Sequence, residues 1–283
     1  MEIIDNIHEM QSRSEALKMA GHSVALVPTM GFFHEGHLEL MRVGKIHADD
    51  LVVSIFVNPM QFGPSEDYAE YPRDMDSDLE KAERVGTGIV FCPTAEQMYP
   101  DGFQTKIGAE KLSGRLCGIS RPGHFDGVLT VVAKLFHITK PHLAIFGQKD
   151  YQQLTIISRM VKDLNMDIRI VGVPVVREPD GIAMSSRNSY LSPDERKSAL
   201  CMKQSLDLAG EMYARGERRV PEMRAALERI ILDQPFTEID YVSFCHPTTL
   251  EEVEVIDGET VLALAVMVGK TRLIDNCIIA KGQ

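Results

Sequence analysis

Apolar, strand-like stretches alternate with helix-like segments along the first 176 residues, and no other feature constrains the fold as much. The stretch 51-LVVSIFV-57 shows it best, because it is apolar, rich in β-branched residues and ended by Asn58-Pro59. Further strands are predicted at 23–27, 89–92, 142–146 and 168–176, and helices at 5–20, 36–48, 73–86, 128–137 and 150–165. Such alternation indicates right-handed crossovers and a mainly parallel sheet. We predict an α/β fold, with a Rossmann-like parallel sheet domain over residues 1–176.

The pattern changes after Arg177. Two helices are predicted at 193–214 and 221–232, and two strands follow at 239–244 and 260–266. Helices followed by strands, rather than alternating with them, are typical of a separate α+β domain. We predict that residues 177–283 form this smaller C-terminal domain and that it acts as a lid over the active site.

Composition and cysteine usage narrow the partners and the location. The 283 residues include 30 basic and 41 acidic ones, for a formal charge of −11, so a nucleic-acid partner, which needs clustered positive charge, is not expected. Five scattered cysteines without a CxxC pair favour reduced thiols in a cytoplasm. No signal peptide is visible, and apolar runs such as 261–268 fall far short of the ~20 residues that span a bilayer. We expect a cytoplasmic protein without a membrane partner.

Unusual polar residues gather where the predicted strands end. These segments are 28-PTMGFFHEGH-37, 58-NPMQFG-63, 147-GQKD-150 and the stretch from Gly181 to 184-MSSRN-188. Open parallel sheets bind their ligands at the carboxyl ends of the strands. We therefore expect four polar loops along one edge of one sheet.

The HEGH segment predicts an anion site at a helix start. His34 and His37, three residues apart, can share one face, and Gly36 removes a side chain where a ligand could approach the backbone. Free N–H groups at a helix N-terminus favour an anion. A metal-binding histidine pair and a pair of capping or packing histidines are the alternatives.

The other loops are more ambiguous. Ser185, Ser186 and Arg187 can hold a polyphosphate or form a solvated turn. Lys149 offers a point charge for phosphate, and Asp150 can accept from ribose hydroxyls or cap the following helix. Gln61, between two apolar residues, is either a ligand or a satisfied structural amide.

Three further groups admit two interpretations each. Arg121 and His124 form a cationic site or a surface turn. The acids Asp74, Asp76 and Asp78 hold Mg²⁺ through water or lie on a solvated helix face. Met30, Met60 and Met184 pack on an adenine ring or fill the core. No GxGxxG follows the first strand and no GxxxxGK[ST] is present, which disfavours a dinucleotide dehydrogenase and a P-loop enzyme.

Taken together and in order, five segments resemble the pantoate–β-alanine ligase family. They are PTMGFFHEGH, SIFVNPMQF, RPGHFDGV, FGQKDYQQL and DGIAMSSRN. The resemblance runs from about residue 22 to 192 and resumes over 261–276. This family belongs to the nucleotidyltransferases whose HxGH element is similar to that of class I aminoacyl-tRNA synthetases.

The resemblance implies a two-step ligation. Pantoate attacks the α-phosphorus of ATP to give pantoyl adenylate and pyrophosphate, and β-alanine then displaces AMP to give pantothenate. Mg²⁺ is expected with ATP, although its protein ligands stay unassigned, and the family's pattern implies a homodimer. Another HxGH-type adenylyltransferase, a noncatalytic ATP-binding sensor and a metal-binding module remain the alternatives.

The resemblance also implies roles for individual residues. ATP would contact Met30, Gly31, His34, Gly36, His37, Gly147, Gln148, Lys149, Asp150, Val176, Met184, Ser185, Ser186 and Arg187. Of these, the catalytic positions would be His34, His37, Lys149 and Arg187, with His37 either stabilising charge or donating a proton. Pantoate would contact Gln61 and Gln153, with Asn58 and Arg121 as further substrate contacts.

Overall fold

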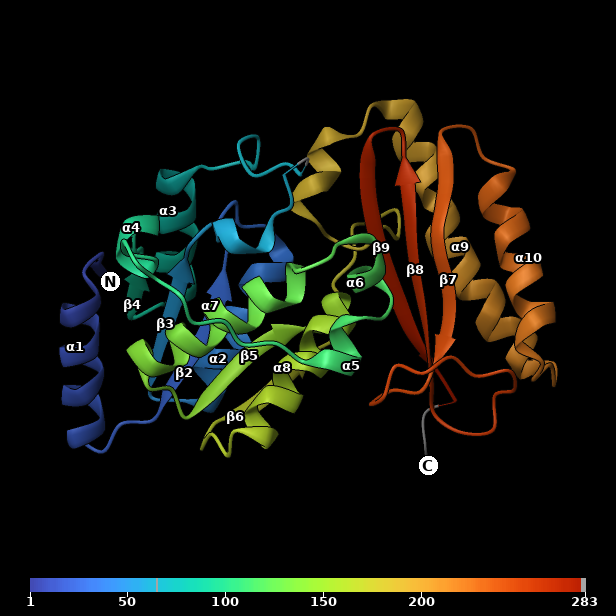
Figure 1. Cartoon of the computed structure of the whole chain (residues 1–283). Helices are drawn as coiled ribbons and strands as arrows, with labels where there is room; N and C mark the ends of the chain where they lie inside the picture. Colours follow the sequence, from blue (N-terminus) through green and yellow to red (C-terminus); the bar gives the residue numbers. More distant parts are fainter. Residues whose placement is uncertain (65, 281–283) are drawn as a thin grey trace. The chain divides into compact units, whose positions relative to one another are not determined.

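The computed structural model describes residues 1–64 and 66–280, which form two compact units (Figure 1). The first unit contains Met1–Ser113, Arg121–Gln148 and Ile156–Pro174; the second contains Gly114–Ser120, Lys149–Thr155 and the chain from Val175 onward. The domain limits at 176 and 177 stay a prediction, because two short segments before residue 176 belong to the second unit.

The first unit is built on a six-stranded parallel sheet. Its strands are β1 (Glu2–Ile4), β2 (Val24–Thr29), β3 (Asp50–Ile55), β4 (Ile89–Phe91), β5 (Leu143–Gly147) and β6 (Arg169–Val173), in the order β1-β4-β3-β2-β5-β6. Every neighbouring pair is parallel. Val24–Val27 is buried at each successive position, which requires cover on both faces. The predicted fold class is thus confirmed.

Helices join and cover these strands. They are α1 (Ile7–Met19), α2 (Glu35–His47), α3 (Met75–Val85), α4 (Ala95–Met98), α5 (Glu110–Ser113), α7 (His124–Thr139) and α8 (Tyr151–Asp163), with 3₁₀ turns η1 (Pro59–Gln61) and η2 (Gln148–Asp150). On one face Met41 of α2 and Ala82 of α3 pack against alternate residues of β2 and β3, such as Val27 and Val53. Helix α7 packs against α1, β2 and η1.

The second unit is an antiparallel α+β body. Its elements are α6 (Cys117–Ser120), η3 (Ser186–Tyr190), α9 (Pro193–Ala214), α10 (Val220–Leu232), β7 (Thr237–Cys245), β8 (Thr260–Val268) and β9 (Thr271–Ile279). The strands pair antiparallel in the order β7-β8-β9, and α9 and α10 pack on the sheet (Figure 1). Phe244, Leu264 and Leu227 are fully buried in the core between them.

Several element boundaries differ from the predictions. Strand β1 was not predicted, because three residues are too few to show a period. Helix α7 begins at His124 rather than at 128, directly after Gly123, whose φ of 81° only glycine adopts readily. Strand β6 ends at Val173 rather than at 176, because Pro174 has no N–H for the ladder. None of the helices in the described ranges is both long and apolar enough to cross a membrane.

Candidate functional site

The loop that follows β2 and the loop that follows β5 flank the point where the sheet changes direction. From β2 the chain crosses to β3 on one side, whereas β5 pairs with the other side of β2. In open parallel sheets such a switch point opens a crevice at the carboxyl ends of the strands. Met30–His37 and Gly147 therefore lie along one edge, with Asn58–Gln61 after β3 beside them, as predicted for three of the four polar loops. The fourth loop, from Gly181 to Asn188, belongs to the second unit.

A tight turn joins β2 to the histidines. The hydroxyl of Thr29 donates to the Ser54 carbonyl at 2.7 Å and accepts from the N–H of Gly31 at 3.2 Å. Gly31 has φ 85° and Phe32 has φ 53°, so two consecutive residues adopt the left-handed conformation. A Cβ on Gly31 would approach Ile55 to 3.2 Å. The left-handed φ and this tight contact both favour glycine at this position.

The carboxylate of Asp78 holds this turn from α3. Its two oxygens accept from the N–H groups of Phe32 and Phe33, each at 2.6 Å, and Lys81 donates to the Phe33 carbonyl at 2.8 Å. Asp78 is 1% exposed, and burial raises the pKa of its carboxyl, an effect that the two N–H donors oppose. The solvated-face interpretation is therefore wrong for Asp78. Its i, i+4 spacing to buried Ala82 was the signal for an inward-facing position.

His34 and His37 meet at the start of α2. His34 is the N-cap residue, and its backbone N–H donates to Nδ1 of His37 at 3.3 Å. The two rings stack with centroids 4.1 Å apart. Because Nδ1 of His37 accepts, the proton of a neutral His37 ring resides on Nε2, where it can be donated to a ligand. The capping interpretation is thus confirmed for this pair, whereas the anion site stays a prediction.

Amide side chains gather at the end of β3. Asn58 is 1% exposed and its Nδ2 donates to Gln61 Oε1 at 3.0 Å and to the Gly127 carbonyl at 3.1 Å. Its Oδ1 accepts from the Tyr99 hydroxyl at 2.7 Å, and burial raises the pKa of that hydroxyl, which stays a donor. Asn58 therefore orients Gln61, whose Nε2 lies 3.2 Å from the sulfur of Met30.

Arg121 and His124 flank a surface turn, because Pro122 and Gly123 are exposed, and their own half-buried side chains join a hydrogen-bond network. The guanidinium of Arg121 donates twice to Glu66, at 2.8 and 2.5 Å, and once to Nε2 of His124 at 3.0 Å. Nδ1 of His124 donates to the Gln61 carbonyl at 2.8 Å. Burial raises the pKa of Glu66, but the hydrogen bond and charge of Arg121 more than offset it, so this pKa lies below its ordinary value.

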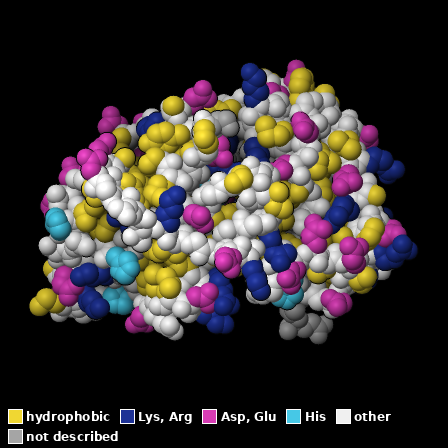
Figure 2. Space-filling view, viewed as in Figure 1, with side chains coloured by type: hydrophobic (Ala, Val, Ile, Leu, Met, Phe, Trp, Pro, Cys, Tyr) yellow, Lys and Arg dark blue, Asp and Glu magenta, His cyan; other side chains and the backbone are white. Residues whose placement is uncertain are grey.

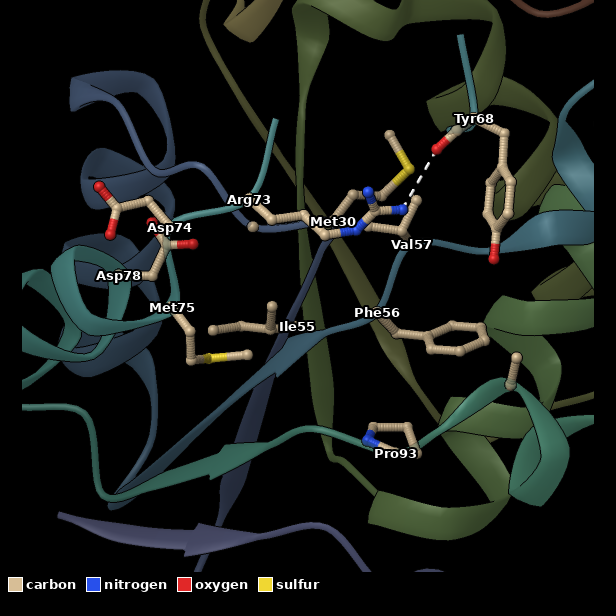
Figure 3. Close-up of a pocket in the computed structure, with 12 residues that line it drawn as sticks. Met30, Ile55, Phe56, Val57, Tyr68, Arg73, Asp74, Met75, Asp78 and Pro93 are labelled. Carbon is tan, nitrogen blue, oxygen red and sulfur yellow. Dashed lines mark hydrogen bonds between the residues drawn. The ribbon is translucent and has the colours of Figure 1, made fainter. Parts of the chain in front are cut away.

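A cavity of about 230 Å³ lies beside the Gly31 turn (Figure 3). Its walls are mostly apolar, with Asp74 and Asp78 on one side and Phe56 and Tyr68 on the other. Arg73 braces the rim by donating to the Tyr68 carbonyl at 3.2 Å. The cavity therefore shares a wall with the turn that carries the histidines.

The second unit carries the remaining predicted phosphate contacts. Residues 176–184 form a hairpin in which the Met184 N–H donates to the Val176 carbonyl at 2.9 Å, and Arg177 bridges to Ala183. Ser185 follows and caps the turn η3, its hydroxyl accepting from the Arg187 N–H at 3.3 Å. Ser186 is buried, whereas Val176, Met184, Ser185 and Arg187 are half-buried.

Lys149, Asp150 and Gln153 lie half-buried around the start of α8, in the same unit. The neighbouring Gln152 accepts from the Cys117 N–H at 3.0 Å and donates to the Arg115 carbonyl at 2.6 Å. In the first unit Met30 to His37 lie together with Asn58 and Gln61. In the second unit Lys149 and the 176–187 segment are each hydrogen-bonded to β9, through Asn276 and Asp275.

Over residues 1–64 and 66–280, no three His, Cys, Asp or Glu side chains are grouped so as to hold a metal ion. On the face shown in Figure 2, basic and acidic side chains are interspersed. All five cysteines fall within those ranges and none forms a disulfide.

The chain matches known proteins along nearly its full length. The family model described as pantoate-beta-alanine ligase matches residues 2–278. The chain is similar to the pantothenate synthetase of Geobacter sulfurreducens, 55% identical over 283 residues and 100% of both chains, and to that of Syntrophus aciditrophicus, 57% identical over 98% of this chain and 96% of the relative.

Solved structures agree. The crystal structure of pantothenate synthetase from Thermus thermophilus has a TM-score of 0.94 and 40% identity, covering 99% of this chain and 100% of that one. The pantoate-beta-alanine ligase of Francisella tularensis, solved with beta-gamma ATP and beta-alanine, has a TM-score of 0.81 and 32% identity, covering 98% and 97%.

Proposed function

The chain belongs to the pantoate–β-alanine ligase family, and from that premise we propose that it joins pantoate to β-alanine at the expense of ATP, releasing AMP and pyrophosphate. The observation that carries the proposal is the family match over residues 2–278. It is supported by the two histidines at the N-terminus of α2 and by the neighbouring hydrogen-bonded amides of Asn58 and Gln61. This combination supports one site for a nucleotide and a small carboxylate.

In the first step a pantoate carboxylate oxygen bonds to the α-phosphorus of ATP, and the bond from that phosphorus to the bridging oxygen breaks. Nε2–H of His37 and the N–H groups at the start of α2 would donate to the phosphate oxygens. Lys149 and Arg187 would balance the charge on the departing pyrophosphate. The enzyme supplies no covalent nucleophile and acts by alignment and charge stabilisation.

In the second step the amine of β-alanine attacks the carbonyl carbon of pantoyl adenylate. The bond to AMP breaks, and the amine loses a proton to give the amide. Gln61, oriented by Asn58, and Gln153 are proposed to hold pantoate through both steps. Arg121 is the proposed partner for the β-alanine carboxylate, since its planar guanidinium already holds one carboxylate, that of Glu66.

Mg²⁺ is proposed to enter as the counter-ion of ATP. The described residues provide no cage of three or more ligating side chains, and Mg²⁺ commonly binds through substrate phosphates and waters. A protein ligand for it is therefore not assigned.

AMP formation tests the proposal. With ATP and Mg²⁺, purified protein should release pyrophosphate only when pantoate is present, and AMP in step with pantothenate only when β-alanine is added as well. A stable dinucleotide product would point to another adenylyltransferase. ATP binding without AMP or pyrophosphate would point to a sensor.

We further propose that the protein works in the cytoplasm as a homodimer. Cysteines without disulfides suit a reducing compartment. Light scattering should give about twice the 31.6 kDa of one chain; a mass of one chain at micromolar concentration would contradict the dimer.

A further inference from the structure

The family-like stretch 261–276 ends in two buried polar residues to which the proposed mechanism gives no task. Asp275 is 3% exposed and Asn276 is 6% exposed, and both lie in the middle of β9. Successive residues of a strand point to opposite faces of its sheet. These two side chains therefore reach away from the strand on different sides.

Asp275 lies on the face that meets the helices. It shares that face with Leu273 and Ile279, both members of the apolar core. A carboxylate there is unfavourable unless it is paired and hydrogen-bonded. Its partner is Arg177, whose two terminal nitrogens donate at 2.7 and 3.0 Å, and the Asn276 N–H adds a third bond at 2.8 Å.

Arg177 transmits this anchoring to the hairpin over residues 176–184. The Arg177 guanidinium also donates to the Gly181 carbonyl at 3.0 Å, so it holds the first strand of the hairpin against its turn. The hairpin ends on the hydrogen-bonded pair Val176 and Met184 and leads directly into the 185–187 segment. The position of Asp275 thus fixes where this proposed nucleotide contact begins.

Asn276 performs the corresponding task on the other face. Its Nδ2 donates to the backbone carbonyl of Lys149 at 2.8 Å. Lys149 precedes α8 and is the proposed phosphate lysine. A single strand therefore contacts both proposed phosphate-binding segments of the second unit through adjacent residues.

We propose that Asp275 and Asn276 are positioning residues for adenylation: together they set the spacing between Lys149 and the 176–187 segment. The inference rests on the proposed function, because it takes both segments to be ATP contacts. A reaction that needs several groups on one triphosphate is sensitive to errors of about 1 Å in their placement.

The test uses two isosteric substitutions and one control. Asp275→Asn removes the charge opposite Arg177, and Asn276→Asp replaces the donor to Lys149 by a carboxylate oxygen. Glu252→Gln is the matched control, because Glu252 also pairs with an arginine and a hydroxyl in this unit, Arg224 and Ser243, and these hydrogen bonds involve neither segment. Pantoate-dependent pyrophosphate release, KM for ATP, KM for β-alanine and Tm are measured for each.

We expect both substitutions to raise KM for ATP and slow pyrophosphate release by roughly 10- to 100-fold, while KM for β-alanine stays at the wild-type value. The Glu252→Gln control should change no more than Tm; its KM values and its rate of pyrophosphate release should stay at the wild-type values. A fall in Tm with KM for ATP unchanged would overturn the inference and leave a purely structural role. If wild-type protein itself releases no pyrophosphate, the proposed function fails, and the positioning role is then judged by the Kd for ATP from calorimetry.

A double variant covers the case in which the single changes do not fold. Arg177→Met with Asp275→Leu replaces the buried pair by apolar side chains, which commonly preserves stability. Restored Tm with adenylation still slowed supports positioning. Restored Tm together with wild-type kinetics would refute it.

Discussion

The Asp78→Asn substitution tests whether a buried carboxylate holds the histidine turn in place. The wild-type carboxylate accepts from two backbone N–H groups at 2.6 Å each. An asparagine has one acceptor oxygen, so one N–H would face an NH₂ group instead. A hydrogen bond to a charged group contributes about 1.5–3 kcal/mol. Losing one corresponds to roughly 10- to 150-fold in the population of the native turn. Adenylation should slow by a similar factor.

Global stability should respond differently. Burial raises the pKa of Asp78 above its ordinary value of 3.8. A carboxyl whose folded pKa is raised contributes stability that is fully present below its unfolded pKa and is lost as pH rises through the folded pKa. Asparagine lacks this titration. The free energy of unfolding of the variant should therefore gain on that of wild type as pH rises from below 3.8 through the raised pKa.

Two measurements are made: pantoate-dependent pyrophosphate release, and urea unfolding as pH rises from below 3.8 through the raised pKa of Asp78. Asp76→Asn is the matched control, because Asp76 lies in the first turn of the same helix and is exposed. The expected result is slow adenylation by a well-folded Asp78 variant and wild-type kinetics for the control. A folded Asp78→Asn protein that releases pyrophosphate at the wild-type rate would refute the reasoning.

Three further predictions concern the proposed contacts. His37→Ala and Lys149→Ala should each lower single-turnover adenylation by on the order of 10²-fold, the loss expected for one electrostatic donor; near-normal rates with a native circular dichroism spectrum would remove them from the site. Glu66→Gln weakens the ion pair that occupies Arg121 and so makes the guanidinium more often available to the substrate. KM for β-alanine should therefore fall by roughly 3- to 10-fold, and an unchanged KM argues against a substrate carboxylate at Arg121. Gly31→Ala forces a side chain into φ 85°, so unfolding in urea should show a loss of about 1–2 kcal/mol or more, and an unshifted midpoint would contradict the turn geometry.

Sequence pattern predicted the parts of the fold that are locally encoded. Strand β3 was predicted because β-branched apolar residues run uninterrupted to Asn58-Pro59, and parallel pairing followed from the alternation with helices. Strand β9 was not predicted, since Arg272, Asp275 and Asn276 interrupt its apolar character. Their partners lie far away in sequence, on β7 and in the 149–177 region. A strand stabilised through polar side chains carries no apolar period.

The candidate site divides in the same way. The loops after β2 and β3 were predicted because glycines, histidines and amides stand out at the ends of apolar runs. The networks that hold them were not, because Asn58 also donates to the Gly127 carbonyl of α7, and the sequence does not show that η1 and α7 are close neighbours. The close packing of η1 against α7 depends on Gly127, where a Cβ would lie 2.3 Å from the Met60 carbonyl oxygen. Nothing in the spacing of residues 61 and 127 indicates it.

Asp78 and Asp275 show why buried acids are informative about function in this chain. Each is at most 3% exposed. A buried charge rarely improves stability over a well-packed apolar residue, so stability alone gives no reason for either. Each instead accepts hydrogen bonds from a segment that leads into a proposed nucleotide contact: Asp78 from the turn before His34, Asp275 from the arginine that opens the 176–184 hairpin. The loss of either acid should therefore slow adenylation in protein that remains folded, beyond any loss of stability that it also causes. The effects of the two substitutions should be independent because the acids lie in different units.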